Sequence, residues 1–337
     1  MQIVTAEKTA VDISIVILNY NDKEYLKGCL LSLDHCSTSR RVEIIVSDNA
    51  STDGSIEMIE SEFPHVRLLK NNENLGFTKG NNAGIKASHG KYVFLLNSDI
   101  KVLDACIDAL ADYLDQNPDV ALAGPRILNR DMSLQCTCRK DPGLWNNFCA
   151  FSGLAGMFPK VSFLSGEQMF YFKGDRTADM DILVGCFSAI RREAIERVGL
   201  LDERFYMYGD ELDWCRRFRE AGWRVVFHPN GQAIHYGGTS TVRKDPVKYA
   251  VLQQNSVLRY WDKYHGLGGC FGIKCLIVFR LISRWLAAFA KYLLSPAKRV
   301  DSGIRMRTSI ACLRTLFSGN SISGSARPAA GSGLGGA

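Results

Sequence analysis

A regular alternation of apolar strand patterns with amphipathic helix patterns constrains the fold more than any other feature of this sequence. Buried-strand patterns occupy residues 12–21, 41–50, 66–71, 91–99 and 120–128, and helix patterns occupy residues 24–33, 51–63, 78–88 and 102–118. In the first of these helices, apolar side chains recur at i, i+3, i+4 and i+7 as Leu26, Cys29, Leu30 and Leu33. Strands separated by helices require right-handed crossovers, so the pattern predicts an α/β fold with a mostly parallel sheet flanked by helices.

Polar side chains follow three of the predicted strands at the point where each strand ends. They are Asn19, Tyr20 and Asn21 after the first strand, Asp48 and Asn49 after the second, and Asn97, Ser98 and Asp99 after the fourth. The carboxyl ends of parallel strands share one edge of a sheet, and ligands of α/β proteins bind outside that edge. We therefore predict one ligand site built from these residues.

The sequence lacks the common phosphate-binding loops. No G-x-G-x-x-G follows the first strand, which excludes an ordinary nicotinamide or flavin site, and no G-x-x-x-x-G-K-[ST] motif is present. A divalent cation is another way to hold phosphate, because Mg²⁺ and Mn²⁺ bind one or two carboxylates together with phosphate oxygens. Asp99 is placed for that role.

Six motifs, taken in order, resemble the inverting nucleotide-sugar glycosyltransferases of family 2, which have the GT-A fold. The motifs are VILNYN, VSDNASTDGS, NNENLGFTKGNNAGI, FLLNSD, GCFSAIRREAIERVG and LDERFYMYGDELDWCRRFREAGWRV. Within that family the chain looks most like the rhamnosyltransferases of bacterial surface polysaccharide synthesis. The resemblance covers residues 11–265, which we take as the transferase domain.

The resemblance implies a role for each strand-end residue in donor binding. Asp48 matches the acid that recognises a uracil or thymine base, with Asn19, Tyr20, Asn21 and Asn49 around it. Asn97, Ser98 and Asp99 match the DxD motif, whose last acid binds Mg²⁺ or Mn²⁺ on the diphosphate. The first acid of the motif is an asparagine here, and an amide does not neutralise a metal. His235 matches a second metal ligand, although a histidine at a strand end is often simply hydrogen-bonded.

Further residues are implied in catalysis and in closure over the donor. Inverting transfer needs a base for the acceptor hydroxyl, and in GDELDW the family's acid pair is reversed. By position Glu211 is the base, Asp210 the reserve candidate, and Asp213 a support or an acceptor contact. Acids in a first helical turn also stabilise the helix dipole without any catalysis. Gly76 and Asn81 lie where the family closes over the donor, or serve packing, and Arg243 either meets the diphosphate or lies on a solvated basic loop.

The C-terminal third is basic and apolar. Residues 241–307 carry 13 Lys or Arg against 3 Asp or Glu. Within residues 270–299, Arg280, Arg284 and Lys291 fall within about 40° on a helix, and no uncharged run of 18 residues exists, so we expect no membrane-spanning helix. The basic excess accompanies an apolar segment and not a folded, aromatic-bearing face, so no nucleic-acid binding is expected. Residues 266–307 are predicted to lie on the cytoplasmic membrane surface, or alternatively to pack on the protein's own core.

The remaining expectations concern location and activity. Residues 1–10 form an N-terminal extension without an apolar leader, and the Gly/Ser/Ala-rich residues 308–337 are expected to be disordered. Eleven scattered cysteines favour a reduced, cytoplasmic compartment. Together these features predict a peripheral enzyme of the bacterial inner membrane that transfers L-rhamnose from dTDP-L-rhamnose to a lipid-linked glycan. Another UDP- or GDP-sugar, a nucleotidyltransferase without its Gly-rich loop, and a non-catalytic nucleotide-sugar-binding protein are the alternatives.

Overall fold

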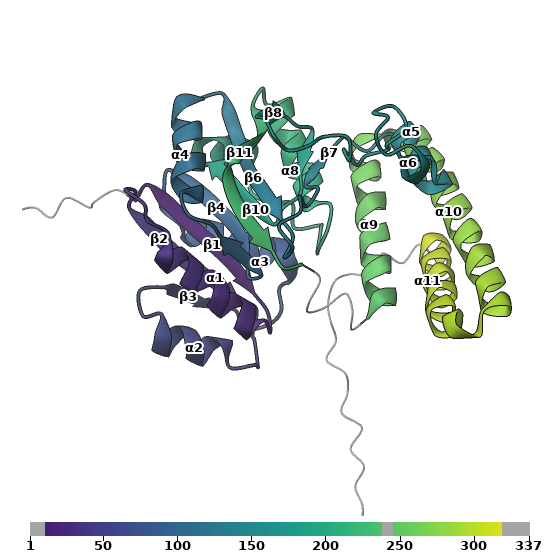
Figure 1. The fold of residues 1–337 in the computed structure, drawn as a ribbon, viewed down its shortest axis with the longest axis horizontal. Coiled ribbons are helices and arrows are strands. Elements are labelled where there is room, and N and C mark those ends of the chain that lie inside the picture. The colour runs from purple at the N-terminus through teal and green to yellow at the C-terminus, as the bar shows by residue number, and fades with distance from the viewer. Residues whose placement is uncertain (1–10, 238–244, 319–337) are drawn as a thin grey trace, which may run out of the picture.

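The structure is a computed structural model that describes residues 11–237 and 245–318, with a nine-stranded sheet at its centre (Figure 1). The strand order is β3 (Arg67–Lys70), β2 (Val42–Asp48), β1 (Ile13–Asn19), β4 (Tyr92–Asn97), β10 (Phe187–Arg191), β6 (Val120–Leu128), β11 (Arg224–His235) and β5 (Ile100–Val102), and β8 (Ala178–Asp179) pairs with β11. Strands β1 to β4, β6 and β11 run in one direction, whereas β5, β8 and β10 run in the other. The α/β fold is confirmed, and β10, which inserts antiparallel between β4 and β6, makes the sheet mixed.

Helices cover both faces of the sheet. Helices α1 (Lys23–His35), α2 (Ser55–Glu62) and α4 (Cys106–Gln116) contribute to one apolar core, and α3 (Gly76–Ala87), α7 (Arg192–Val198) and α8 (Asp210–Glu220) contribute to the other. Strand β1 serves both cores, because Ile15 and Ile17 point to the first and Val16 to the second. Helix α1 buries Leu26, Cys29, Leu30 and Leu33, as its periodicity predicts. A small second sheet pairs β7 (Cys138–Arg139) with β9 (Ile182–Leu183).

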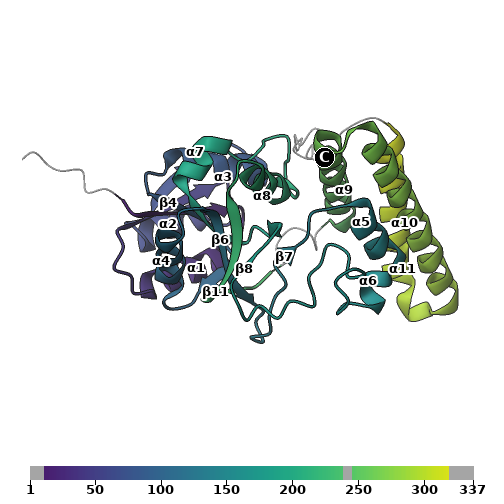
Figure 2. The same cartoon turned by 90° about the horizontal axis from the view of Figure 1, so that it is seen from above.

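Beyond the sheet, helices from the end of the chain pack on one another and on a helix from its middle (Figures 1 and 2). These elements are α9 (Pro246–Tyr264), α10 (Gly266–Leu294), the short 3₁₀ helix η1 (Pro296–Lys298), α11 (Arg299–Ser318) and α5 (Leu144–Ser152), which α6 (Leu154–Met157) follows. Their shared core includes Trp261 of α9, Ile273 and Ile277 of α10, and Cys312 of α11. We call α9, α10 and α11 the C-terminal helices.

The expected disorder of residues 308–337 is wrong for residues 308–318, which belong to α11. Packing against α9 orders these residues, because Cys312 is 3% exposed and its carbonyl accepts a hydrogen bond from Gln254 Nε2 of α9 at 2.9 Å. The rest of the tail and the extension at residues 1–10 lie outside the described residues. The proposed domain limit at residue 265 falls between α9 and α10, whose side chains share one core.

We expected no membrane-spanning helix, but α10 is long and apolar enough to cross a membrane. Within the described residues it is the one helix that passes this test, with a mean hydropathy of 1.6 in its most apolar 18-residue window, of which 17% is buried. Its isolated basic residues interrupt every uncharged run, yet they are too few to make the whole helix polar. Length and composition alone do not distinguish a span from a helix that lies against a membrane or a protein core.

Candidate active site

The predicted strand ends do meet at one edge of the sheet. In the register of the parallel strands, Asn19 is paired with Asp48, and Leu18 is paired with Asn97. Asp99 follows two residues after Asn97 in a turn that leads into β5. The residues that were predicted from three separate strands therefore surround one point.

A cleft of about 190 Å³ opens at this edge. Its lining includes the predicted residues Tyr20, Asn49, Gly76, Asn97, Ser98 and Asp99, together with Leu18, Asp22, Asn74, Phe77, Tyr206, Met207 and Tyr249. This volume is below the roughly 300 Å³ at which small-molecule sites usually begin. A nucleotide sugar would thus occupy the cleft together with the open surface beside it.

Asn19 and Asp48 form the buried floor behind this lining. Both are 0% exposed, and Asn19 Nδ2 donates to Asp48 Oδ2 at 2.7 Å. Ser51 completes the group, because its backbone N–H donates to Asp48 Oδ1 at 2.8 Å. Asn19 Oδ1 is buried and has no hydrogen-bond partner among the described residues. Among the side-chain oxygens of Asn19 and Asp48 it is the one without a donor, and it suits a donor such as the imide N–H of a base.

Two other predicted residues hold the backbone and do not line the cleft. Asn21 adopts a positive φ of 51°, and its Oδ1 accepts the Thr52 N–H at 2.7 Å, which ties the loops after β1 and β2 together. Asn81 is 2% exposed and donates to the Phe77 carbonyl of its own helix at 3.0 Å. Their contribution to this site is therefore structural.

Gly76 lies at the start of α3 and forms part of the cleft wall. Its φ is +81°, and a Cβ atom there would lie 2.5 Å from the ring of Tyr206. Asn49 Nδ2 donates to the Gly76 carbonyl at 3.0 Å. Further along α3, Gly80 and Gly84 allow close packing on Leu18 and Val16 of β1, so these two glycines serve packing.

Replacing Gly76 with alanine is expected to destabilise the protein by about 1–3 kcal/mol, because the side chain meets the Tyr206 ring and the backbone conformation is strained. Displacing Tyr206 also deforms the cleft, so nucleotide affinity should fall with it. Urea denaturation and calorimetric titration of nucleotide measure the two effects. Gly143→Ala is the matched control, since its φ is −116° and no atom lies within 4 Å of the new Cβ. Equal losses in both variants would contradict this interpretation.

Asp99 and His235 lie side by side at the mouth of the cleft. His235 Nε2 is 3.3 Å from Asp99 Oδ1, and their side chains are 18% and 13% exposed. The Tyr236 N–H donates to the Asp99 carbonyl at 3.0 Å, which fixes the end of β11 against the turn. His235 Nδ1 is 2.6 Å from Gln135 Oε1. If Nδ1 donates to that oxygen, the lone pair of Nε2 points to Asp99, as in many metal sites.

This pair fits a divalent cation that also binds the substrate. Within residues 11–237 and 245–318, no group of three or more His, Cys, Asp or Glu side chains has a metal-binding arrangement. The protein would then supply two ligands, and diphosphate oxygens and water would supply the rest, which is usual for Mg²⁺.

Ser98 Oγ donates to Asp22 Oδ2 at 2.8 Å, and burial together with the charge of Asp99 raises the pKa of Asp22. Asp22 was not predicted, and its position three residues after β1 is the only sequence signal for it.

The acids of α8 approach the site from the other side. Tyr208 and Gly209, both with positive φ, turn the chain into this helix. Asp210 is 2% exposed, and burial and the adjacent charge of Glu211 hold its pKa well above the usual range. A Cβ on Gly185 would lie 3.6 Å from Glu211 Cβ. Burial therefore favours the protonated form of Asp210, and Glu211 is the less buried member of the pair.

Cys186 is close enough to both Asp99 and Glu211 for their charges to act on its thiol. Burial raises the pKa of the Cys186 thiol to about 12, and the charges of Asp99 and Glu211 both contribute. The Cys186 carbonyl accepts the Asn97 N–H at 3.0 Å, next to the DxD-like turn. Glu211 is not part of the cleft lining. It is next to Gly185, and the adjacent Cys186 is hydrogen-bonded to the lining residue Asn97.

Asp213 faces away from the cleft. It is 0% exposed, and its carboxylate accepts hydrogen bonds from Arg217 Nε at 2.8 Å, from the Tyr264 hydroxyl at 2.7 Å and from Lys263 Nζ. Because Lys263 and Tyr264 belong to α9, Asp213 ties α8 to the C-terminal helices. This position agrees with a supporting role and does not offer Asp213 to an acceptor. Arg243, the predicted diphosphate contact, lies outside the described residues.

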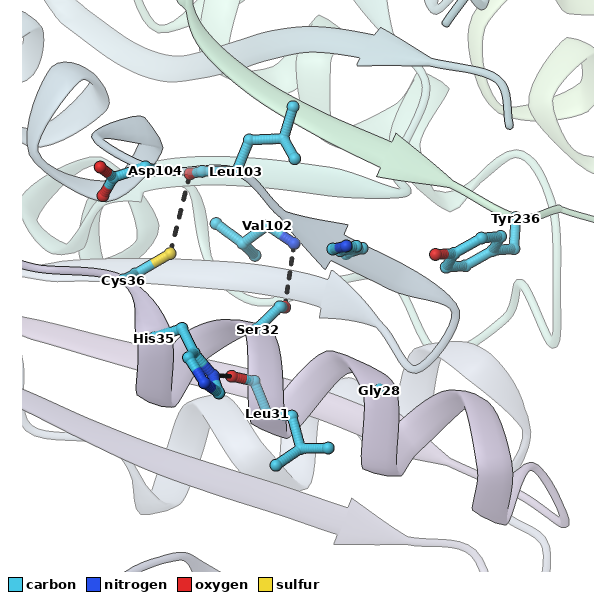
Figure 3. A pocket seen from close by; sticks show the side chains of 10 residues that line it. Gly28, Leu31, Ser32, His35, Cys36, Val102, Leu103, Asp104 and Tyr236 are labelled. Carbon is cyan, nitrogen blue, oxygen red and sulfur yellow. Dashed lines mark hydrogen bonds between the residues drawn. The ribbon is translucent and has the colours of Figure 1, made fainter. Parts of the chain in front are cut away.

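A larger hollow of about 550 Å³ lies between α1 and β5, with Tyr236 at one end (Figure 3). Its lining is mostly apolar, and Ser32 Oγ in its wall accepts the Val102 N–H at 3.0 Å. In Figure 3 Ser32 faces it from α1, Cys36 faces it from the residue that follows this helix, and Asp104 lies at the end opposite Tyr236. It contains none of the predicted site residues, so size alone does not identify the active site.

Comparison with protein families decides the assignment of the chain. Residues 14–199 match the model described as Glycosyl transferase family 2. The chain belongs to glycosyltransferase family 2. The matched residues contain every strand-end residue of the cleft, whereas Glu211 and His235 come after them. The nucleotidyltransferase alternative is set aside, and the chain is a glycosyltransferase.

Two curated relatives of this family 2 enzyme carry rhamnosyltransferase names. The N-acetylglucosaminyl-diphospho-decaprenol L-rhamnosyltransferase of Mycobacterium tuberculosis is 28% identical over 269 residues, which cover 75% of this chain and 85% of that protein. The dTDP-rhamnosyl transferase RfbF of Shigella flexneri is 22% identical over 238 residues, which cover 69% of this chain and 71% of that protein. The predicted likeness to rhamnosyltransferases of family 2 is confirmed.

Solved structures confirm the GT-A fold of the enzyme. The mannosyltransferase PcManGT from Pyrobaculum calidifontis, solved with GDP-Man and Mn²⁺, covers 93% of this chain and 88% of its own, with a TM-score of 0.55 and 16% identity. GalNAc-T7, solved with UDP, GalNAc and Mn²⁺, covers 77% of this chain and 49% of its own, with a TM-score of 0.53 and 16% identity. At this identity the likeness establishes the fold alone.

Proposed function

We propose that this family 2 enzyme transfers L-rhamnose from dTDP-L-rhamnose to a lipid-linked glycan with inversion at the anomeric carbon. The observation that carries the proposal is the placement of Asp99 and His235 at the mouth of the strand-end cleft, with Glu211 close by across Cys186. The names of the two bacterial relatives support the choice of donor. The product would enter O-antigen, capsule or cell-wall polysaccharide.

Each part of the donor has a counterpart in the cleft. The base would lie toward Tyr20 and Asn49, above the floor made by Asn19 and Asp48. The diphosphate would lie at Asp99 and His235, where a bound Mg²⁺ or Mn²⁺ offsets the negative charge of the leaving nucleotide. Both similar structures were solved with Mn²⁺, which supports a divalent cation here.

Glu211 would act as the general base. In a direct displacement, the acceptor hydroxyl attacks the anomeric carbon while the nucleoside diphosphate leaves, and the hydroxyl proton passes to a carboxylate. Asp210 is kept protonated by burial, so it is poorly suited to accept that proton. Glu211 is half-buried and lies next to Gly185, one residue before Cys186, which is hydrogen-bonded to Asn97 of the cleft.

The acceptor would be presented at the cytoplasmic face of the bacterial inner membrane. The Mycobacterium tuberculosis relative is named for a decaprenol-linked acceptor, and this name supports a lipid-linked acceptor here. The basic excess in residues 241–307 supports attachment to an anionic membrane surface as a peripheral enzyme.

A panel of donors tests this proposal. The purified enzyme, supplied with Mn²⁺ or Mg²⁺, is incubated with dTDP-rhamnose, UDP-sugars and GDP-mannose, and nucleotide release and thermal stabilisation are measured for each donor. We expect dTDP-rhamnose to give the largest signal and chelation of the metal to remove it. A few contacts of about 1–3 kcal/mol each decide such selectivity. A preference for GDP-mannose would overturn the donor assignment.

A further inference from the structure

Exposed apolar side chains are concentrated on one part of the molecule. Of the 24 large apolar side chains that are exposed in the described residues, 21 lie within residues 144–170 and 267–317. These ranges contain α5, α6, α10 and α11, which lie together at one end of the molecule, away from the strands (Figures 1 and 2). Soluble monomers rarely leave so much contiguous apolar surface uncovered, so this surface needs a partner.

Helix α10 turns an uncharged apolar face away from the protein. It buries Ile273, Ile277 and Leu281 in a stripe with i, i+4 spacing. About 140° from the centre of this stripe, at about 100° per residue, lie Phe271, Ile282, Leu286 and Phe289, which are 72%, 47%, 55% and 41% exposed. Arg280, Arg284 and Lys291 fall on the side of the buried stripe. The basic residues therefore flank the protein side of the helix, and its outward face is entirely apolar.

The segment at residues 144–163 extends this apolar surface. Helix α5 packs on α10, and a Cβ atom on Gly272 of α10 would lie 3.0 Å from Leu144 Cδ2. The Trp145 ring lies 4.9 Å from the Phe163 ring, and its Nε1 donates to the Phe163 carbonyl at 2.9 Å. Met157 and Phe163 are 71% and 67% exposed. An aromatic cluster thus stands beside the outward face of α10.

We propose that residues 144–163 and the outward face of α10 form a single surface that inserts into the interfacial region of an anionic lipid bilayer. Neither residues 142–166 nor residues 263–300 contain an Asp or Glu, whereas both ranges contain Lys or Arg. An apolar face bordered only by cations matches anionic lipid, and aromatic side chains are favoured at that depth. A second copy of the same surface would bring cations together without acids to pair with them. The proposal rests on the proposed function only for the location of the acceptor.

Vesicle binding by a charged variant tests the surface. Met157→Glu/Phe163→Glu places two carboxylates at the most exposed large apolar positions of residues 144–163. Met132→Glu, at a side chain that is 54% exposed and lies outside the surface, is the matched control. The full chain is sedimented with phosphatidylglycerol or phosphatidylcholine vesicles. We expect wild type and Met132→Glu to bind phosphatidylglycerol vesicles, and the double variant to bind at least about tenfold more weakly. Unchanged binding by the double variant would refute the surface.

Two further measurements on the same samples separate the possible outcomes. Thermal stabilisation by dTDP should be equal in all three proteins, which shows that the variants are folded and that the cleft is intact. Sedimentation equilibrium without lipid should give the same mass for all three. If wild type is a dimer that the double variant dissociates, while vesicle binding persists, the surface joins two copies and the lipid proposal is wrong. If vesicles bind as expected but no nucleotide sugar does, the proposed function fails and the membrane surface stands.

Discussion

Replacing Glu211 with glutamine is expected to lower the transfer rate by about 10²–10⁴-fold while donor affinity stays within about twofold of wild type. Glutamine keeps the size of the side chain but does not accept the acceptor proton. Glu211 does not line the cleft, so the affinity for the donor should hardly change. Single-turnover transfer and calorimetric titration of dTDP measure the two quantities separately.

Asp210→Asn is the matched control for this variant. Burial and the charge of Glu211 already hold the Asp210 carboxyl in its protonated form, and an amide resembles that form in shape and charge. We therefore expect Asp210→Asn to keep most of the activity and to fold at least as stably as wild type. Loss of transfer in Asp210→Asn with normal transfer in Glu211→Gln would move the base to Asp210.

The second large effect is expected at the link between α8 and the C-terminal helices. Lys263→Met removes the ammonium group that Asp213 and Asp202 share, and it leaves the buried Asp213 carboxylate with Arg217 and Tyr264 alone. Breaking a buried ion pair typically costs about 3–5 kcal/mol. We expect a loss near the lower end of that range, because two partners remain. Urea denaturation followed by circular dichroism measures it.

Arg224→Met provides the comparison for this stability loss. Arg224 also has two acidic partners, Asp119 and Asp179, but its side chain is 40% exposed, so its loss should cost no more than about 1 kcal/mol. Asp213 and Glu211 are two residues apart and project about 200° from each other on α8. Anchoring Asp213 to α9 therefore turns Glu211 toward the cleft, and Lys263→Met should also slow transfer. A cost equal to that of Arg224→Met would show that the link is unimportant.

The strand-end part of the site was predictable because it depends on local patterns and one topological rule. Continuous apolar runs identified β1, β2 and β4, and parallel pairing then required Asn19, Asp48 and Asn97 to end level with one another. The opposite wall was not predictable in this way. Tyr206 and Tyr249 reach the cleft from distant segments, and positive φ values at Tyr208 and Gly209, which no periodic pattern indicates, direct the chain between them.

The remaining predictions depended on which residues contact one another across the fold, and sequence periodicity does not show this. Asp210, Glu211 and Asp213 share one helical turn and look alike in sequence. Of these three acids, only Asp213 is bound by Lys263 and Tyr264, about 50 residues away. Helix α10 is apolar nearly all round, so its pattern does not indicate which side packs on the protein. Arg280, Arg284 and Lys291 lie on the same side of α10 as its buried residues, although Arg284 and Lys291 remain exposed.

The most direct test of the central claim is calorimetric titration of dTDP into wild type and Asp99→Asn, each with and without Mn²⁺. Asn97 carries no charge, so Asp99 is the only carboxylate of the DxD-like turn. The account predicts that Mn²⁺ tightens dTDP binding to wild type by at least about tenfold and that Asp99→Asn binds dTDP equally with and without Mn²⁺, at the metal-free wild-type affinity. Mn²⁺ that strengthens dTDP binding equally in both proteins, or in neither, would contradict a diphosphate site built on Asp99.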